Sequence, residues 1–328
     1  MIISRTPLRI SFFGGGTDYP DWYKKNGGSV ISVTINKYNF INVRFLPPFF
    51  KYNNCIRYFT REETKTISDI KHPSVRETLK FLNFDNGIEV VHNADLPARG
   101  GLGSSSSFTV GFLNAMSALR GKISTKKELT NNAIHIEQNL IKESVGSQDQ
   151  AAAAFGGLNR IFFGGRENVV VKPLILTNRN IDKLQDHMML FFLGFPRNAS
   201  TIAKHQISLI SKKKSYLNEI SSIVNYAEEI ISKKNIDFKE FGQLLNTQWQ
   251  LKRKLSNKIS NSYIDNIYNE FLKQGALGGK LCGAGGGGFM LIFTKKNKQK
   301  KILNKMKKIL HVPFRFEFTG SQIVYYSK

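Results

Sequence analysis

The hydrophobic pattern in the first half of the chain predicts a mixture of strands and helices. Runs rich in Ile, Val and Phe, which strands favour, alternate with segments whose apolar residues recur at helical spacing. The pattern predicts strands at residues 1–13, 29–45 and 87–92, and helices at residues 105–119, 126–143 and 151–155.

The second half is mostly helical. We expect helices at residues 201–212, 216–234, 238–255, 262–273 and 298–310, and strands at 187–195, at 289–293 and near Phe314 and Val324. Strand-rich sequence gives way to helix-rich sequence near residue 180. This change predicts two domains, residues 1–180 and residues 181–328.

The composition is that of a globular protein. A chain of 328 residues that is 41% hydrophobic is long enough for about two domains and is neither disordered nor collagen-like. Cys55 and Cys282 are too far apart in sequence to suggest a disulfide scaffold or a zinc site, and they fit a reducing compartment. The apolar run at 188–195 is much shorter than the roughly 20 residues that span a bilayer, and Arg5 and Arg9 come too early for a signal peptide. We therefore expect a soluble, cytoplasmic protein with no membrane partner.

The charge is strongly positive, with 48 Lys and Arg against 24 Asp and Glu. Such an excess suits nucleic acids, acidic membranes and small phosphorylated ligands alike. Lysines crowd residues 295–308, but Ile302, Leu303 and Met306 recur there at helical spacing, which predicts an amphipathic helix with a solvated lysine face. A nucleic-acid-binding protein is the alternative from another class. We expect no nucleic-acid partner, because the sequence shows no basic, aromatic-lined binding module.

One glycine- and serine-rich segment has the form of a phosphate cradle. It lies between a predicted strand and a predicted helix, where glycines let the backbone approach a ligand and free N–H groups suit a phosphate. It lacks the Gly-Lys-Ser/Thr ending of a Walker A loop. The alternative interpretation is a flexible linker followed by a serine N-cap. The candidate nucleotide-binding residues are Pro97, Arg99, Gly100, Gly101, Leu102, Gly103, Ser104, Ser105, Ser106 and Ser107.

Two further glycine-rich segments are candidates for ligand contact. The first ends a strand and offers N–H groups and a carboxylate to a polyhydroxyl compound, unless it is an ordinary hairpin. It consists of Gly14, Gly15, Gly16, Thr17 and Asp18. The second, residues 278–288, precedes a buried strand. It fits tight backbone packing near an active site as well as it fits substrate contact through Gly285.

Two carboxylates occupy unusual positions. Glu137 falls within the apolar stripe of its predicted helix, where burial is costly without a cation or strong donors. Either a bound metal ion or an ion pair would offset the cost of burying the Glu137 carboxylate. Asp149 falls in the first turn of a short helix, where Ser147 and Gln150 have the spacing of a capping box. Helix stabilisation explains Asp149 as well as catalysis does.

Together and in this order, these segments resemble those of the GHMP kinases, over essentially the whole chain. The resemblance is most specific at residues 97–105. It implies an α+β fold of two domains, the first a mixed α/β domain and the second a ferredoxin-like α+β domain with extra helices. It also implies ATP and Mg²⁺ as cofactors and a small-molecule acceptor.

The same resemblance implies roles for individual residues. Asp149 matches the catalytic aspartate of the family, and Arg9 matches the arginine near the transferred phosphoryl group. Ser105 and Glu137 match the residues that bind Mg²⁺, and Asp18 matches the carboxylate that holds sugar hydroxyls.

Within the superfamily, the triple glycine before Thr17 and Asp18 most resembles the D-glycero-D-manno-heptose 7-phosphate kinases. Those enzymes phosphorylate the anomeric hydroxyl of a heptose that carries a 7-phosphate, on the path to a GDP-activated heptose for surface polysaccharide. Arg197 is expected to bind the 7-phosphate, unless it is a surface arginine at a helix entry. A fucokinase-like sugar 1-kinase is the nearest alternative, whereas Gly15 and Gly16 depart from the Glu-His of galactokinase. The oligomeric state stays open between a monomer and a homodimer.

Overall fold

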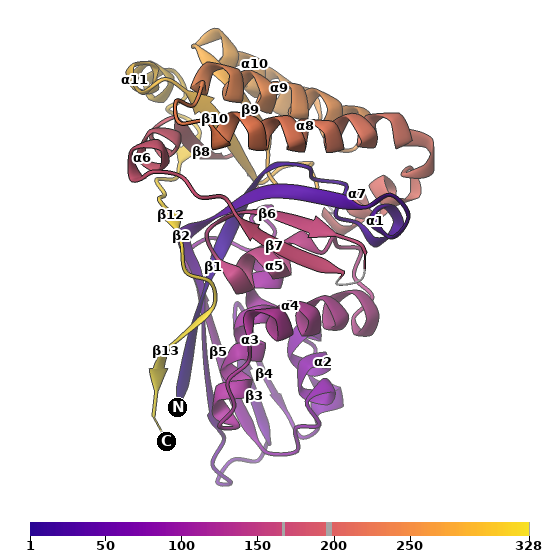
Figure 1. Ribbon diagram of the computed structural model, residues 1–328. Helices are drawn as coiled ribbons and strands as arrows, with labels where there is room; N and C mark the ends of the chain where they lie inside the picture. The colour runs from indigo at the N-terminus through magenta and orange to yellow at the C-terminus, as the bar shows by residue number, and fades with distance from the viewer. Residues whose placement is uncertain (166–167, 195–198, 328) are drawn as a thin grey trace.

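The computed structural model describes residues 1–165, 168–194 and 199–327, which form two sheets with helices packed around them (Figure 1). Within these ranges the first sheet has nine strands, six of them in the order β13-β1-β2-β5-β3-β4. β6 and β12 pair with β2, and β7 pairs with β6. These strands are β1 Ile2–Phe13, β2 Gly28–Phe45, β3 Asn54–Arg57, β4 Arg61–Thr64, β5 Ile88–Ala94, β6 Leu158–Phe163, β7 Val169–Pro173, β12 Phe316–Glu317 and β13 Gln322–Tyr326.

The long pair β1 and β2 forms the centre of this sheet, and it pairs antiparallel from Ile2 opposite Val43 to Phe13 opposite Ile31. Every residue of β1 from Thr6 to Phe13 is buried, because helices cover both faces of the strand. Figure 1 shows two of these helices above β1 and β2 and two below. They are α8 Lys214–Ser232 and α9 Phe238–Leu255 above, and α3 Ser104–Leu119 and α5 Gln148–Phe155 below.

The second sheet has the order β11-β8-β10-β9 and is antiparallel throughout. Phe241 of α9 joins it to the first sheet, because its ring lies 5.2 Å from that of Phe13 and 5.1 Å from that of Phe293. The two sheets therefore share one hydrophobic core, and the predicted α+β class is confirmed. The strands are β8 Met188–Phe192, β9 Ala276–Leu281, β10 Phe289–Thr294 and β11 Leu310–His311.

The remaining helices lie around these two sheets. They are α1 Pro20–Asn26, η1 Ile67–Asp69, α2 Pro73–Phe81, α4 Lys126–His135, η2 Ile136–Leu140, α6 Asn178–Asp186, α7 Ala199–Ser208, η3 Ser211–Lys213, α10 Ser262–Lys273 and α11 Lys296–Lys305. No helix in the three described ranges is both long and apolar enough to cross a membrane.

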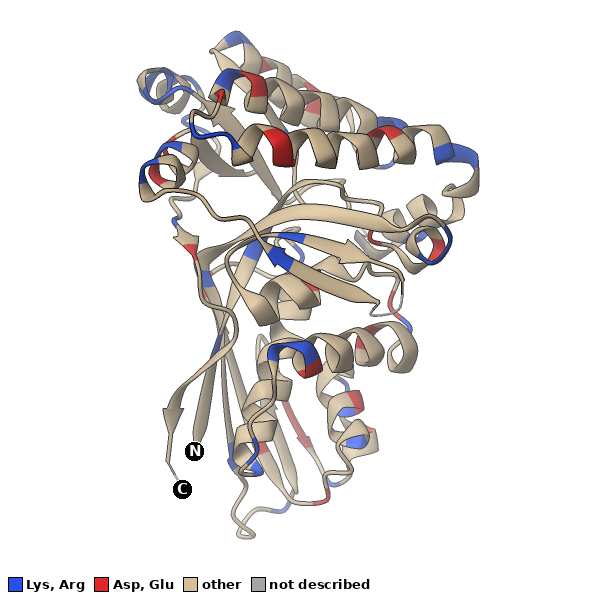
Figure 2. Cartoon of the chain, viewed as in Figure 1, with Lys and Arg blue, Asp and Glu red and all other residues tan. Residues whose placement is uncertain are grey.

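The lysine-rich segment forms the expected amphipathic helix. α11 buries Ile302 and leaves most of its lysines exposed. Figure 2 shows Lys and Arg distributed over many helices and over strands of the first sheet. Most of the net charge of +24 therefore lies on solvated surfaces.

The predicted helix at residues 126–143 is correct at its start and too long at its end. α4 begins with a capping box between Thr125 and Glu128. It then passes into the π-helical turn η2, which ends at Leu140. Such turns are rare and often mark functional sites, and this one carries the buried Glu137.

The last described part of the chain returns to the first sheet. β12 pairs with β2, and β13 pairs with the free edge of β1. The strands predicted near Phe314 and Val324 are thus present, although the first of them begins at Phe316. The division at residue 180 stays a prediction, and the structure adds that β12 and β13 belong to the sheet of the first half.

Gly156→Ala is expected to destabilise the protein by about 1–3 kcal/mol more than Gly121→Ala does. Both glycines have φ of +70°, so both substitutions strain the backbone. A Cβ at Gly156 would also lie 2.2 Å from the backbone N of Gly320, whereas a Cβ at Gly121 meets nothing within 4 Å. Urea unfolding of the two variants measures the difference, and equal losses would show that the 319–320 segment is not packed on α5.

Candidate active site

The predicted phosphate cradle is a tight loop that leads into α3. Gly103 precedes the helix in the left-handed conformation and no side chain caps it, so the first N–H groups of α3 remain available to a ligand. The loop is held from two sides. Arg9 N donates to Leu102 O at 3.0 Å, and Phe289 N donates to Gly100 O at 3.0 Å. The segment is therefore a held loop with an uncapped helix start and not a flexible linker.

Arg9 and Asp149 form an ion pair at this helix start. Arg9 Nε donates to Asp149 Oδ1 at 2.7 Å, and Nη2 lies 2.6 Å from the same oxygen. The Arg9 side chain is 5% exposed and that of Asp149 is 24% exposed, so only the carboxylate is open to an incoming group. A Cβ on Gly103 would lie 3.4 Å from Asp149 Cγ, which places the pair directly beside the loop. This arrangement places a carboxylate, a guanidinium and an uncapped helix N-terminus side by side.

Asp18 lies next to this pair. Its carboxylate accepts hydrogen bonds from Gly16 N at 2.9 Å and from Gln148 Nε2 at 2.8 Å. Burial raises the pKa of Asp18, and the charge of Asp149 raises it further. A Cβ on Gly146 would lie 1.9 Å from Asp18 Oδ2, so only glycine fits there. The structure thus brings the first glycine-rich segment and α5 together.

Thr17 holds this loop in shape. Its hydroxyl donates to Gly14 O at 2.8 Å, and a second contact of 3.1 Å joins it to Ser29 O. Gly14 N donates to Gln248 of α9 at 3.3 Å. The loop is therefore fixed against both β2 and α9, and it is not an ordinary hairpin.

Ser147 and Gln150 do not form the capping box that their spacing suggests. The Ser147 hydroxyl makes no cap bond and lies 3.1 Å from the Tyr23 hydroxyl. Gln150 instead donates to Glu137 at 2.5 Å. Both side chains serve tertiary contacts, because the neighbouring buried groups offer partners that a surface helix lacks.

Glu137 is fully buried with one oxygen unsatisfied. Its Oε2 accepts from Ser106 Oγ at 2.8 Å and from Gln150, whereas Oε1 has no hydrogen-bond partner in the described part of the chain. Burial raises the pKa of Glu137 to about 7, and the nearby hydroxyl and amide donors offset only part of this effect. An unpartnered buried carboxylate oxygen beside a serine hydroxyl fits a hard cation such as Mg²⁺.

The serine that contacts Glu137 is Ser106, whereas Ser105 is exposed. The structure does not bring the predicted Ser105 and Glu137 into contact. No group of three or more His, Cys, Asp or Glu residues that could hold a metal is found among the described residues. A cation at Glu137 would therefore complete its shell with hydroxyl, water or phosphate oxygens.

The third glycine-rich segment packs against the phosphate loop. A Cβ on Gly283 would lie 2.4 Å from Gly101 Cα, and a Cβ on Gly288 would lie 2.4 Å from Gly100 O. Gly285 faces the other way, because its Cβ position lies 2.7 Å from Ile259 O. Tight backbone packing accounts for Gly283 and Gly288, and the substrate contact predicted for Gly285 stays a prediction.

Two family models match this chain. The model of the GHMP kinases N terminal domain matches residues 70–157, and the GHMP kinases C terminal model matches residues 227–312, together more than half of the chain. This protein belongs to the GHMP kinases. The family consists of ATP-dependent kinases that phosphorylate small molecules.

Individual relatives give the same assignment. This GHMP kinase is 28% identical to D-glycero-alpha-D-manno-heptose 7-phosphate kinase of Campylobacter jejuni, over 97% of this chain and 96% of that protein. It is 26% identical to L-fucokinase/L-fucose-1-P guanylyltransferase of Bacteroides fragilis, over 90% of this chain but only 35% of that protein. The solved structure of a D-glycero-D-manno-heptose 1-phosphate kinase from Bacteroides thetaiotaomicron shares the fold, with a TM-score of 0.80, 22% identity and complete coverage of both chains.

The GHMP kinase also has buried lysines that its sequence pattern did not single out. Lys252 of α9 is 4% exposed and donates to Gly283 O, and Lys280 of β9 is 2% exposed. Lys280 donates to Ser11 O at 2.8 Å and to Phe12 O at 3.1 Å, which links β9 to β1. One feature of the sequence indicated that Lys252 is buried. It falls three residues after Trp249 and seven after Leu245, which are apolar and lie on the buried stripe of the helix.

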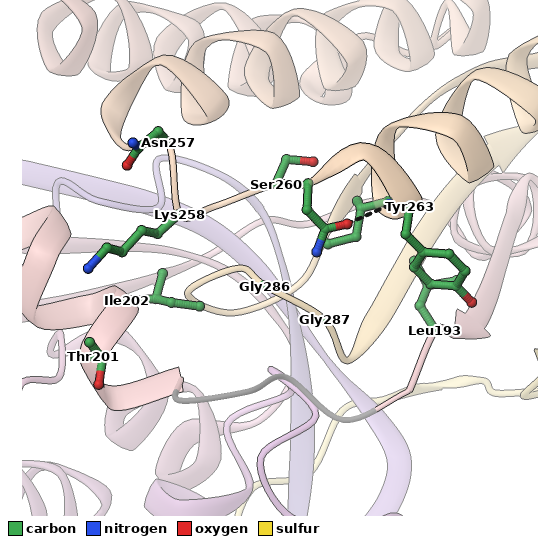
Figure 3. A pocket seen from close by; sticks show the side chains of 11 residues that line it. Leu193, Thr201, Ile202, Asn257, Lys258, Ser260, Tyr263, Gly286 and Gly287 are labelled. Carbon is green, nitrogen blue, oxygen red and sulfur yellow. Dashed lines mark hydrogen bonds between the residues drawn. The ribbon is translucent and has the colours of Figure 1, made fainter.

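A cavity of about 600 Å³ lies beside the third glycine-rich segment. Figure 3 shows Thr201 of α7, Lys258 from the α9–α10 turn, and the backbone of Gly286 and Gly287 around it. Arg9 and Asp149 are not part of its lining. A much smaller cavity has Gly16, Gln206 of α7 and Lys213 among its lining residues. Arg197, the cation predicted for a 7-phosphate, lies outside the described residues.

Proposed function

We propose that this protein transfers the γ-phosphoryl group of ATP to the anomeric hydroxyl of D-glycero-D-manno-heptose 7-phosphate, giving the 1,7-bisphosphate. The observation that carries the proposal is the Arg9–Asp149 pair beside the start of α3, with Asp18 next to it. The relationship to the Campylobacter jejuni enzyme along nearly the whole of both chains supports the choice of sugar. This step would serve GDP-heptose and surface polysaccharide synthesis in the cytoplasm, where ATP is available.

The chemistry follows from the positions of these side chains. The ATP phosphates lie along Gly100 to Ser107 at the positive end of α3. Asp18 binds sugar hydroxyls, and Asp149 accepts the proton of the anomeric hydroxyl as its oxygen bonds to the γ-phosphorus. Arg9 pairs with Asp149 and offsets charge on the phosphoryl group. The bond to the bridging oxygen breaks, and its electron pair leaves with ADP.

We also propose that a divalent cation binds at Glu137. Glu137 is the described residue best suited to hold this cation, together with a serine hydroxyl at the start of α3. The observed contact with Glu137 favours Ser106 for this role, whereas the family pattern favours Ser105. Bound Mg²⁺ supplies charge neutralisation for the β- and γ-phosphates.

The 7-phosphate needs a cation at the far end of the sugar. Among the described residues, Lys258 lines the larger cavity beside α7 and offers a point charge to a phosphate. Arg197 keeps its predicted role.

A panel of acceptors with ATP and Mg²⁺, followed by ³¹P NMR of the product, tests this proposal. We expect an anomeric phosphate on heptose 7-phosphate, with kcat/KM at least about tenfold above that for heptose, since charged hydrogen bonds contribute about 1.5–3 kcal/mol. Equal kcat/KM for the two sugars would remove the need for a 7-phosphate site. Transfer to L-fucose alone would favour the fucokinase-like alternative, which the Bacteroides fragilis relative supports. Transfer only to mevalonate would contradict a sugar kinase.

A further inference from the structure

Lys252 is a buried cation for which the reaction above has no role. It is 4% exposed in the middle of α9, whereas Lys254 on the same helix is exposed. Burial lowers the pKa of Lys252 to about 8, so the ammonium is still the main form at neutral pH. A buried ammonium is costly unless anionic or strongly accepting groups surround it. A lysine on this face therefore requires a specific partner.

The carbonyls that bind Lys252 and Arg9 belong to glycines that touch each other. Lys252 Nζ donates to Gly283 O, and Arg9 Nη1 donates to Gly101 O at 2.7 Å. Gly283 packs so closely on Gly101 that a Cβ on it would lie 2.4 Å from Gly101 Cα. The two cations therefore meet at the phosphate loop from different parts of the chain.

The face of α9 that carries Lys252 also lies along the candidate sugar loop. Gln248, one turn earlier, accepts a hydrogen bond from Gly14 N at 3.3 Å. Leu255, three residues later, comes within 3.3 Å of the Cβ position of Gly16. Side chains three and four residues apart share one helix face. Lys252 thus lies between the sugar loop and the phosphate loop.

The charged groups at this junction differ in how fully they are partnered. Asp18 and Asp149 are the carboxylates that influence the pKa of Lys252, and burial lowers the pKa of Lys280 well below its usual value. Lys280 is bound to two carbonyls of β1, and Arg9 is paired with Asp149. The Lys252 ammonium has three donors and one observed acceptor, so it can bind an incoming anionic oxygen.

We propose that Lys252 binds the phosphoryl group during its transfer, as a second cation beside Arg9. This inference rests on the proposed kinase function. In that step the sugar oxygen bonds to the γ-phosphorus, the hydroxyl proton goes to Asp149, and the electron pair of the breaking bond leaves with ADP. Lys252 keeps its proton and offsets the negative charge on the phosphoryl oxygens.

Lys252→Met and Lys252→Gln test this role together. Both variants are expected to lower kcat by about 10²–10³-fold, the usual effect of losing one donor to transition-state charge. The KM for the sugar should change little, since the contact forms with the phosphoryl group. Lys252→Gln keeps a donor for Gly283 O without the charge, so it separates the two functions of the side chain. A Lys252→Gln enzyme with wild-type kcat would overturn the proposal.

A binding measurement makes the test independent of turnover. By calorimetry, ADP with Mg²⁺ should bind the variants within about twofold of wild type, whereas ADP, Mg²⁺ and aluminium fluoride with the sugar should bind at least about tenfold more weakly. Lys254→Met is the matched control, because Lys254 lies on the same helix but is exposed, with its ammonium over the half-buried Tyr216 ring. It should match wild type in both measurements.

Thermal unfolding separates this role from a structural one. Because burial opposes the charge of Lys252, Lys252→Met should leave the Tm unchanged or raise it. A lower Tm with a parallel loss of ADP binding, or a change only in the KM for the sugar, would overturn the proposal. If heptose 7-phosphate is not the substrate, the same comparison with the sugar that is accepted tests Lys252 separately from the substrate assignment.

Discussion

Replacing Asp149 with asparagine should lower kcat by about 10²–10⁴-fold, the usual contribution of a general base. The amide cannot accept the hydroxyl proton, and it leaves Arg9 without the carboxylate that now binds it at 2.6–2.7 Å. ATP binding should change little, because the phosphates bind the glycine loop and the start of α3. Steady-state kinetics for turnover and calorimetry for ATP measure the two effects separately.

The control for this variant is Asp21→Asn. Asp21 also lies in the first turn of a helix, but it is exposed and belongs to α1. Both substitutions remove a favourable charge from a helix N-terminus, which is worth about 0.3–1 kcal/mol. Only Asp149→Asn should affect turnover. An Asp149→Asn enzyme with wild-type kcat would show that Asp149 serves α5 alone.

Glu137→Gln is expected to raise the Mg²⁺ concentration needed for half-maximal activity by at least about tenfold, since outer-shell changes alone already weaken metal sites about 10–100-fold. The buried Oε1 without a hydrogen-bond partner is the atom that would meet the cation. An amide of the same shape preserves an acceptor for Ser106. Stability without Mg²⁺ should not fall, because the variant removes a buried carboxylate. Activity titrated with Mg²⁺ and the Mg²⁺-dependent Tm shift with ADP both report this change.

Glu143→Gln provides the comparison. Glu143 lies just beyond η2, and burial raises its pKa as well, so its substitution also removes a partly buried carboxylate. Its Mg²⁺ dependence should equal that of wild type. Equal Mg²⁺ dependence in Glu137→Gln and wild type would instead assign Glu137 to packing with Ser106 and Gln150.

The sequence located the candidate site better than it resolved its details. Gly103, Asp149 and Asp18 stand out in sequence because glycine loops and misplaced carboxylates are local signals, and the structure brings them together. The choice between Ser105 and Ser106 is different, because successive helical residues point about 100° apart and only tertiary packing fixes that rotation. The structure places Ser106 against Glu137.

Non-local contacts account for the rest of what the sequence did not predict. Lys252 resembles any other lysine of a basic chain until α9 packs its face against the glycine loops. β3 and β4 are four residues each and polar at several positions, so their pairing gives little periodic signal. η2 departs from the period of an ordinary helix, and this explains why the predicted 126–143 helix ran past Leu140. The sequence also did not predict α2 and α6, because both helices are short, amphipathic and rich in polar residues.

The return of β13 to β1 has a consequence for biosynthesis. On the ribosome, β1 emerges well before β13, because the entire second sheet lies between these two strands in sequence. Until β13 arrives, the nascent chain presents an open strand edge of the kind at which proteins associate wrongly. Pairing of Ile2 to Arg5 with β13 covers that edge, and Met1 N donates to Ser327 O at 2.5 Å beside it. Chaperone dependence during synthesis should therefore concentrate on the segment of the chain that holds Arg9.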